Sequence, residues 1–253
     1  MAISFLKAIF KNGEPMATQN RTVNKTMARI ISAVNNREKI IVYGKGNQEG
    51  ICSIAILILV LRYFNADFDY FLIPKRGNRE TLISDIKTHS IFYNPGVILS
   101  LDEAFTKNVQ DSLDDVDTEL ITLERWQERD SISFKKSEPL IKSVFLFAKE
   151  LSMSYNTENF YRYVDLVFLG ADLKEMAHDE LINQGLHRLE VSTNYGIKAL
   201  KEAGNMENEA IRTMIRPKDN PWSMVDNSRI IIELLTTEDL HRAEQIAKYL
   251  MNS

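Results

Sequence analysis

Hydrophobic positions in the first half of the chain alternate between short apolar runs, typical of buried strands, and longer segments with helical periodicity. Ile51–Phe64 is apolar almost all round, which favours a core helix over a strand. Strands and helices alternate at the spacing that parallel crossovers require, so we expect an α/β fold with a doubly wound parallel sheet. The predicted strands are Lys39–Tyr43, Asp67–Ile73, Val97–Leu101 and Glu119–Leu123, and the predicted helices are Ile51–Phe64, Thr81–His89 and Glu103–Leu113.

After Trp126 the pattern becomes helical, and no strand pattern of comparable quality follows. We therefore expect a parallel α/β domain over residues 1–130 and a helical extension packed on it over residues 131–253. The connector between the halves is predicted near Asp130–Glu138. The predicted helices of the second half are Pro139–Leu151, Phe160–Leu169, Asp179–Leu189, Gly196–Ala203, Asn208–Ile215, Asn227–Leu235 and Glu238–Met251.

Composition narrows the class of protein. The 253 residues are 44% hydrophobic and 26% charged, which is an ordinary globular profile. Cys52 is the single cysteine, so no intrachain disulfide can form and a reducing cytoplasm is the expected location. The longest apolar run, Ile54–Leu61, is too short to span a bilayer. A net charge of −4 argues against a protein whose main activity is sequence-independent electrostatic binding of DNA.

A glycine-rich loop, Gly44–Gly50 with the sequence GKGNQEG, lies between the first predicted strand and the first predicted helix. Ligands of parallel sheets bind at the carboxyl ends of strands, and a helix N-terminus there favours an anion. Lys45, Gly46 and Gly50 are thus candidate phosphate ligands. The spacing GxGxxxG matches neither the dinucleotide fingerprint nor the P-loop, so a tight turn without a ligand is the alternative.

Read with its flanks, the loop resembles the opening motif of the DHH phosphoesterase superfamily, in particular its RecJ branch of single-strand exonucleases. The run KIIVYGKGNQEGICSIAILILVLRYF resembles that family's strand, YGDYDADG loop and helix. VILSLDEA, ELITLER, DLVFLGADLKEM, INQGLHRLEVSTNYGIKALKEAG and IRPKDNPWSMVDNSRIIIELLTTEDLHRAEQIAKYL resemble later family segments in the family's order. The resemblance covers nearly the whole chain and implies the family's α/β fold.

The departures from the family motifs fall on its metal ligands. Three aspartates of the first motif become Lys45, Asn47 and Glu49, while Asp102 of the second motif remains. The Asp-His-His positions become Leu123, Glu124 and Arg125, the aspartate of the fourth motif aligns with Asp172, and a family arginine becomes Met224.

The resemblance implies two divalent cations, manganese or magnesium, held by carboxylates and a histidine. Here Lys45 and Arg125 stand where metal ligands are expected. At ~4 Å and an effective dielectric constant near 20, each unit-charge pair contributes roughly 4 kcal/mol, so two fixed cations oppose metal binding. We therefore expect no cofactor and a salt-bridged remnant in which Lys45 and Arg125 neutralise Asp102 and Glu49. The alternative is an active manganese- or magnesium-dependent phosphodiesterase with a rebuilt site of Glu49, Asp102, Asp172 and Glu124.

Other candidate groups have ordinary structural roles as alternatives. Arg212, Arg216 and Lys218 with Trp222 offer phosphate contacts and a stacking surface for single-stranded nucleic acid, or simply a solvated face. We expect Cys52 to be an inert buried thiol and His187 to be exposed. The acidic run from Asp111 to Glu119 is either a solvated helix end or a docking surface for a basic partner.

By resemblance, the leading hypothesis is a catalytically inactive RecJ-like protein that binds a protein partner or single-stranded DNA in DNA replication, recombination or repair. Relatives that keep the fold and lose the metal ligands include a subunit of the eukaryotic replicative helicase and archaeal partners of the GINS complex. The chain ends where the family's linking helix would begin, so we expect the second, substrate-gripping domain to be absent. The alternatives are a single-strand 5′ exonuclease or small phosphodiesterase, and a nucleotide sensor that binds phosphate at Lys45.

Overall fold

The computed structural model describes residues 20–73, 79–113, 118–124, 138–204, 207–217 and 221–252. Four parallel strands form one sheet in the order β2-β1-β3-β4. They are β1 (Ile40–Lys45), β2 (Phe68–Ile73), β3 (Val97–Ser100) and β4 (Glu119–Thr122). The predicted doubly wound parallel sheet is confirmed, with each predicted strand present within two residues of its expected ends.

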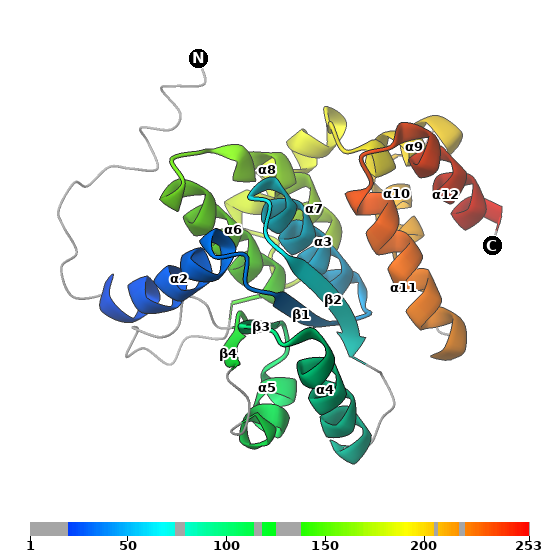
Figure 1. Cartoon of the computed structure of the whole chain (residues 1–253). Coiled ribbons are helices and arrows are strands. Elements are labelled where there is room, and N and C mark those ends of the chain that lie inside the picture. Colours follow the sequence, from blue (N-terminus) through cyan, green and yellow to red (C-terminus); the bar gives the residue numbers. More distant parts are fainter. Residues whose placement is uncertain are drawn as a thin grey trace.

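Helices cover both faces of the sheet, so the molecule has three layers (Figure 1). One face carries α4 (Arg79–Tyr93), α5 (Glu103–Val109) and the short 3₁₀ helix η1 (Gln110–Ser112). The other face carries α3 (Gln48–Tyr63), with the helices of the second half packed around it. Successive residues of β1 point to opposite faces of the sheet. Ile40 and Val42 belong to the hydrophobic cluster on the α3 side, and Ile41 and Tyr43 belong to the cluster on the other side.

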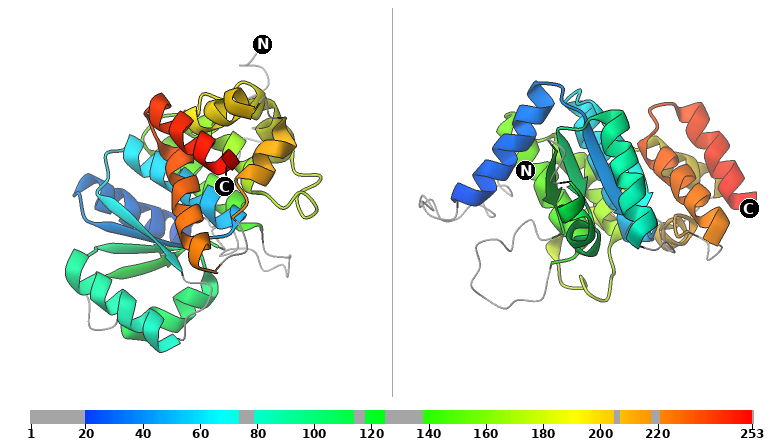
Figure 2. Two further views of the ribbon diagram at one scale, coloured as in Figure 1. Left: turned by 90° about the vertical axis from the view of Figure 1, so that its right-hand side faces the viewer. Right: turned by 60° about the horizontal axis from the view of Figure 1, so that its bottom comes forward.

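The second half of the described chain is helical (Figure 2). It contains α6 (Leu140–Ser154), η3 (Asn159–Tyr163), α7 (Val164–Gly170), α8 (Glu180–Glu190), α9 (Tyr195–Gly204), α10 (Asn208–Met214), α11 (Pro221–Thr236) and α12 (Leu240–Asn252). One hydrophobic cluster runs from the sheet through α3 into these helices. The predicted boundary near residue 130 lies outside the described residues and stays a prediction.

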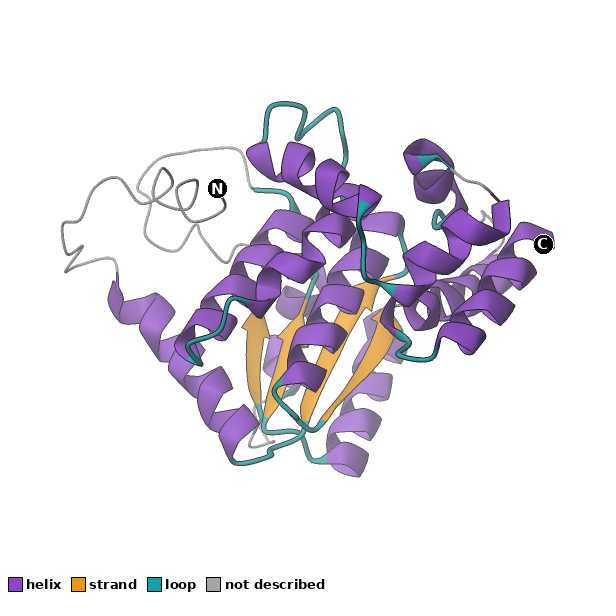
Figure 3. Cartoon of the chain, turned by 90° about the horizontal axis from the view of Figure 1, so that it is seen from above, coloured by secondary structure: helices purple, strands orange, loops and turns teal. Residues whose placement is uncertain are grey.

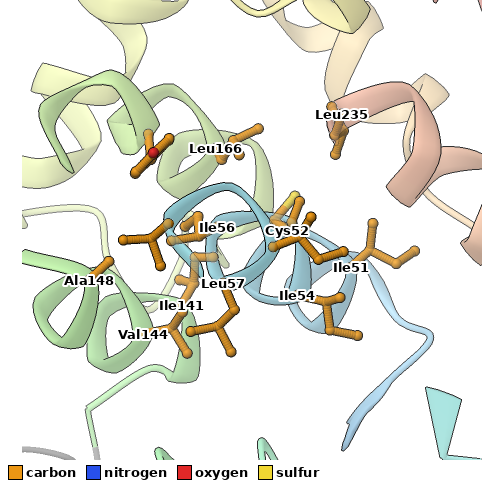
Figure 4. Close-up of a cluster of buried hydrophobic side chains, with 14 of the residues drawn as sticks. Ile51, Cys52, Ile54, Ile56, Leu57, Ile141, Val144, Ala148, Leu166 and Leu235 are labelled. Atoms are coloured by element: carbon orange, nitrogen blue, oxygen red, sulfur yellow. The ribbon is translucent and has the colours of Figure 1, made fainter. Parts of the chain in front are cut away.

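Helix α3 is the centre of the larger core, which explains why it is apolar on nearly every side. It packs against β1, α6, α7 and α11, so Ile51, Ile54, Ile56 and Leu57 all face protein (Figure 4). Asn47 caps its N-terminus by accepting a hydrogen bond from the Gly50 N–H at 3.0 Å. The burial of this helix from Gly50 to Ile58 therefore follows from its central position.

Three features differ from the predicted elements. The helix α2 (Asn20–Asn35) was not predicted; its residues Met27, Ile30 and Val34 join the core at the edge of the molecule (Figure 3). The segments predicted as the single helices Glu103–Leu113 and Phe160–Leu169 each divide into a 3₁₀ turn and an α-helix. Helix α11 begins at Pro221, six residues before the predicted start, because proline is tolerated in the first turn of a helix.

Within the described residues, no helix has the length and apolar character that a membrane-crossing segment requires.

Candidate functional site

The carboxyl ends of three strands bring the motif residues to one edge of the sheet. Lys45 is the last residue of β1, Asp102 follows β3, and Glu124 follows β4. The order of the strands reverses between β1 and β3, and in doubly wound sheets this switch point is where ligands bind. The fold therefore positions Lys45 and Asp102 where a ligand site is expected.

Lys45 and Asp102 form an ion pair across this switch point. The Lys45 Nζ lies 2.8 Å from the Asp102 Oδ2, which confirms the expected salt bridge between these two residues. The other carboxylate oxygen, Oδ1, accepts the backbone N–H groups of Ala104 at 2.8 Å and Phe105 at 3.2 Å, so Asp102 caps α5. The Asp102 side chain is 8% exposed, whereas the Lys45 side chain is 52% exposed. Both oxygens of the retained aspartate are thus already bound.

Glu49 lies in the first turn of α3 and is half-buried. Its Oε1 accepts the Ile141 N–H at 3.2 Å and so holds the first turn of α6 against α3. Burial raises the pKa of Glu49, the hydrogen bond from Ile141 opposes that shift, and the nearby acids Glu175 and Glu124 add to it. The expected partner of Glu49, Arg125, lies outside the described residues.

Glu124 and Asp172 are also engaged locally. The Glu124 Oε2 accepts the backbone N–H of Glu103 in a short hydrogen bond at the start of α5. The Asp172 Oδ1 accepts the Lys174 N–H at 2.8 Å within the turn that follows α7, and Asp172 is exposed. Each candidate metal ligand therefore accepts a hydrogen bond from a backbone N–H group.

This arrangement does not fit a pair of divalent cations. Such ions require several anionic oxygens that converge on one point, and here an ammonium group occupies the space beside Asp102. Within the residues that the structure describes, no group of three or more His, Cys, Asp or Glu side chains is placed to hold a metal ion. No reaction step through a metal can be derived from these residues.

The glycines of the loop are explained by close packing. A Cβ at Gly50 would lie 2.2 Å from the Lys45 carbonyl oxygen, and a Cβ at Gly46 would lie 2.8 Å from the Ser228 Oγ. Ser228, on α11, donates to the Gly46 carbonyl at 2.9 Å. Helix α11 therefore packs against the loop and holds it in place. Phosphate binding by Lys45, Gly46 and Gly50 stays a prediction.

A pocket of 670 Å³ opens beside the loop. It is lined by residues of the loop, of the turn after α7 and of α10, including Gln48, Asp172, Lys174, Arg212 and Arg216. Arg212 is 7% exposed and donates to the main-chain carbonyls of Phe168 at 2.6 Å and Ala171 at 2.9 Å. Arg216 is exposed, with its Nε 3.4 Å from the Gln48 Oε1.

Of the four candidate nucleic-acid contacts, Arg216 thus offers its side chain to solvent, whereas Arg212 is bound inside the protein. Lys218 lies outside the described residues, and the side chain of Trp222 lies outside them too. Gln48 was not among the predicted site residues, yet its Nε2 donates to the carbonyls of Leu169 at 2.7 Å and Arg212 at 3.2 Å. No local pattern marks Gln48, because its partners come from α7 and α10.

Two further expectations are confirmed. Cys52 is fully buried, and burial raises the pKa of its thiol, so it is an unreactive core residue. The His187 side chain is 84% exposed.

Comparison with known proteins agrees with the motif resemblance. The single-stranded-DNA-specific exonuclease RecJ of Bacillus subtilis (strain 168) is 25% identical over 248 residues, a match that covers 87% of this chain and 30% of that protein. The crystal structure of RecJ from Thermus thermophilus in complex with Mn²⁺ matches with a TM-score of 0.68 and 20% identity over 91% of this chain and 37% of that chain.

A crystal structure of exonuclease RecJ bound to manganese matches with a TM-score of 0.71 and 17% identity, over 92% of this chain and 65% of that chain. No family model matches the sequence. The chain thus spans about a third of the length of the curated RecJ that it matches. The sequence match and the fold together confirm the resemblance to RecJ: the chain has a RecJ-like α/β fold.

Proposed function

We propose that this protein is a RecJ-like chain without nuclease activity that acts by binding, through a protein partner, single-stranded DNA or both, in DNA replication, recombination or repair. The observation that carries the proposal is the ion pair between Lys45 and Asp102 at the switch point of the sheet. An aspartate stands at the position of Lys45 in the family motif, so a ligand has been exchanged for a positive charge.

The charge balance supports the proposal. A divalent cation at this edge would have to displace the Lys45 ammonium from Asp102 and would lie beside it afterwards. It would also compete with the backbone N–H groups that now bind Asp102, Glu49 and Glu124. A protein that binds a partner or DNA without catalysis does not need to displace Lys45 or these backbone N–H groups.

Two features favour a binding role. The 670 Å³ pocket beside the loop carries Lys174 and Arg216 as exposed cations that can contact the phosphates of a single strand, and the acids Glu49, Asp172 and Glu209 line the same pocket. On the opposite side of the sheet, α4 exposes 80% of Ile91 and 78% of Phe92, an apolar pair that suits a protein partner.

The decisive experiment measures hydrolysis and binding on the same preparation. Purified protein is incubated with Mn²⁺ or Mg²⁺ and 5′-labelled single-stranded DNA, and binding is followed by fluorescence anisotropy. We expect no product above background, and any binding should weaken in Arg216→Ala but not in Lys87→Ala, an exposed cation on α4. Pull-down from the native host identifies the partner.

Metal-dependent product formation that Asp102→Asn abolishes would overturn the inactive assignment and favour the rebuilt site of Glu49, Asp102, Glu124 and Asp172. Asparagine is the appropriate substitution because it retains the capping ability of the side chain while removing its charge. Absence of both DNA binding and a captured partner would refute the binding role.

A further inference from the structure

A second pocket, of 470 Å³, lies at the opposite end of α3 from the motif residues. Helix α3 is 16 residues long, so its two ends are about 24 Å apart. The pocket forms where the C-terminus of α3 meets η3, the start of α9 and the turn between α11 and α12. None of the residues that align with the family's metal ligands lines it.

Three cations line this pocket: Arg62 from α3, Arg162 from η3 and Lys198 from α9. Glu238 is the one acidic residue in the lining, so the pocket carries an excess of positive charge. Within the described part of the chain, none of the three cations forms an ion pair with a carboxylate. This excess favours an anionic ligand.

The hydrogen bonds of these cations leave donors for a ligand. The Arg62 Nη1 donates to the Thr236 carbonyl at 2.5 Å, which holds the guanidinium at the rim of the pocket. Arg162 makes a long contact of 3.3 Å with the Asn159 Oδ1. Guanidinium groups with further N–H donors bind phosphate oxygens well, because the planar fork can present two donors at once.

The same pocket also presents aromatic faces. Tyr63 and Tyr195 line it with 50% and 37% of their surface exposed. The Lys198 Nζ lies 5.8 Å from the centroid of the Tyr195 ring, so a cation and an aromatic face occur side by side. Thr193, Asn194 and Thr237 are the neutral polar residues of the same lining, and the Asn194 side chain is bound to the Leu235 carbonyl and the Ile197 N–H.

The start of α9 adds to the positive potential. Asn194 caps this helix by accepting the Ile197 N–H at 3.2 Å, and Tyr195 is its first residue. N–H groups in the first turn of a helix have no helical partners and favour anions. The volume of the pocket falls within the range of small-molecule sites, roughly 300–1,000 Å³.

We propose that this pocket binds a nucleoside phosphate: Arg162 and Lys198, with Arg62 at the rim, hold the phosphate, and a tyrosine face stacks on the base. The ligand is either a free nucleotide or the terminal nucleotide of a strand, since both carry the same chemistry. The site is independent of the metal motif and of the proposed inactivity.

Isothermal titration calorimetry tests the assignment with AMP, GMP, inorganic phosphate, adenosine and a 5′-phosphorylated decanucleotide. We expect a mononucleotide to bind more tightly than inorganic phosphate or adenosine alone, because the phosphate contacts and the stacking of the base then act together. Arg162→Ala and Lys198→Gln should each weaken nucleotide binding about tenfold. Tyr195→Leu should weaken nucleotide binding and leave inorganic phosphate binding unchanged.

Arg216→Ala at the other pocket and Lys87→Ala on α4 are the matched controls, and neither should alter nucleotide affinity. Tighter binding of the decanucleotide that also depends on Lys198 would identify a strand end as the source, and binding of mononucleotides alone would identify a free nucleotide. The proposal is refuted if no probe binds at millimolar concentration, or if binding survives the Arg162 and Lys198 substitutions and is lost in Arg216→Ala.

Discussion

The Lys45 ammonium lies 2.8 Å from the Asp102 carboxylate, between the carboxyl ends of the two strands at which the sheet reverses its order. Asp102 simultaneously caps α5 through the N–H groups of Ala104 and Phe105. The retained acidic residue of the motif therefore has a structural role at the position where a RecJ-like motif would place a metal ligand.

Replacing Lys45 with aspartate tests the role of its charge. We expect Lys45→Asp to lower the free energy of unfolding by about 1 kcal/mol, because a partly exposed ion pair is lost and two carboxylates then face each other. Mn²⁺ should recover part of this loss. Thermal unfolding with and without Mn²⁺ measures the effect, and Lys87→Asp is the control. A large Mn²⁺ stabilisation of the unaltered protein would contradict the exclusion of metal by Lys45.

Two substitutions of Asp102 separate its cap from its charge. Asp102→Ala removes both and should cost about 1–2 kcal/mol of unfolding free energy, whereas Asp102→Asn keeps a capping oxygen and should cost less than about 1 kcal/mol. Urea denaturation measures both. Equal losses in the two variants would show that the ion pair, and not the cap, determines the contribution of Asp102.

Arg212 stabilises the turn after α7 and is expected to matter for folding. Arg212→Met leaves the buried carbonyls of Phe168 and Ala171 without their donor and should cost about 3 kcal/mol. Arg216→Met, on the same segment but exposed, should change stability by less than about 0.5 kcal/mol. Urea denaturation of the pair measures the difference, and similar stabilities would contradict the structural role of Arg212.

Asp165 makes stability depend on pH. Burial raises the pKa of this 1% exposed carboxyl group to about 6, although hydrogen bonds from Ser192 and the Leu166 N–H oppose the shift. The unfolded chain ionises near pH 3.9, so folding takes up a proton between about pH 4 and 6. The contribution of Asp165 to stability is thus greatest below pH 4, falls as the pH rises to about 6, and then stays constant, a change of about 3 kcal/mol.

We expect Asp165→Asn to abolish this component. The free energy of unfolding of the variant minus that of the parent should increase from pH 4 to pH 6 and then stay constant. Urea denaturation across that range measures it. Glu202→Gln, a substitution of an exposed residue on α9, is the control, and its difference in unfolding free energy from the parent should not change with pH. A flat difference for Asp165→Asn as well would mean that the buried carboxyl group keeps an ordinary pKa.

The strand pattern was predictable because residues 40–43 of β1 and residues 97–99 of β3 are buried on both faces of the sheet and are therefore continuous apolar runs. The α3 helix was predictable from its length and its apolar character. The helix α2 was missed although its core residues Met27, Ile30 and Val34 have the i, i+3, i+7 spacing of an amphipathic helix, so the sequence did carry a signal for it. The divided helices were missed because a 3₁₀ turn keeps the apolar spacing of an α-helix over so few residues.

By itself, the sequence determined the alternation of strands and helices, the RecJ-like order of the motifs and the exchange of a motif aspartate for Lys45, because periodicity and residue identity are local properties. The meeting of Lys45 and Asp102 followed from the parallel sheet that this periodicity predicts. Tertiary structure alone decided that Glu49 binds the Ile141 N–H, that Arg212 points inward, and that Arg62, Arg162 and Lys198 share a pocket. These partners are far apart along the chain, and only the packing of the helices around α3 brings them together.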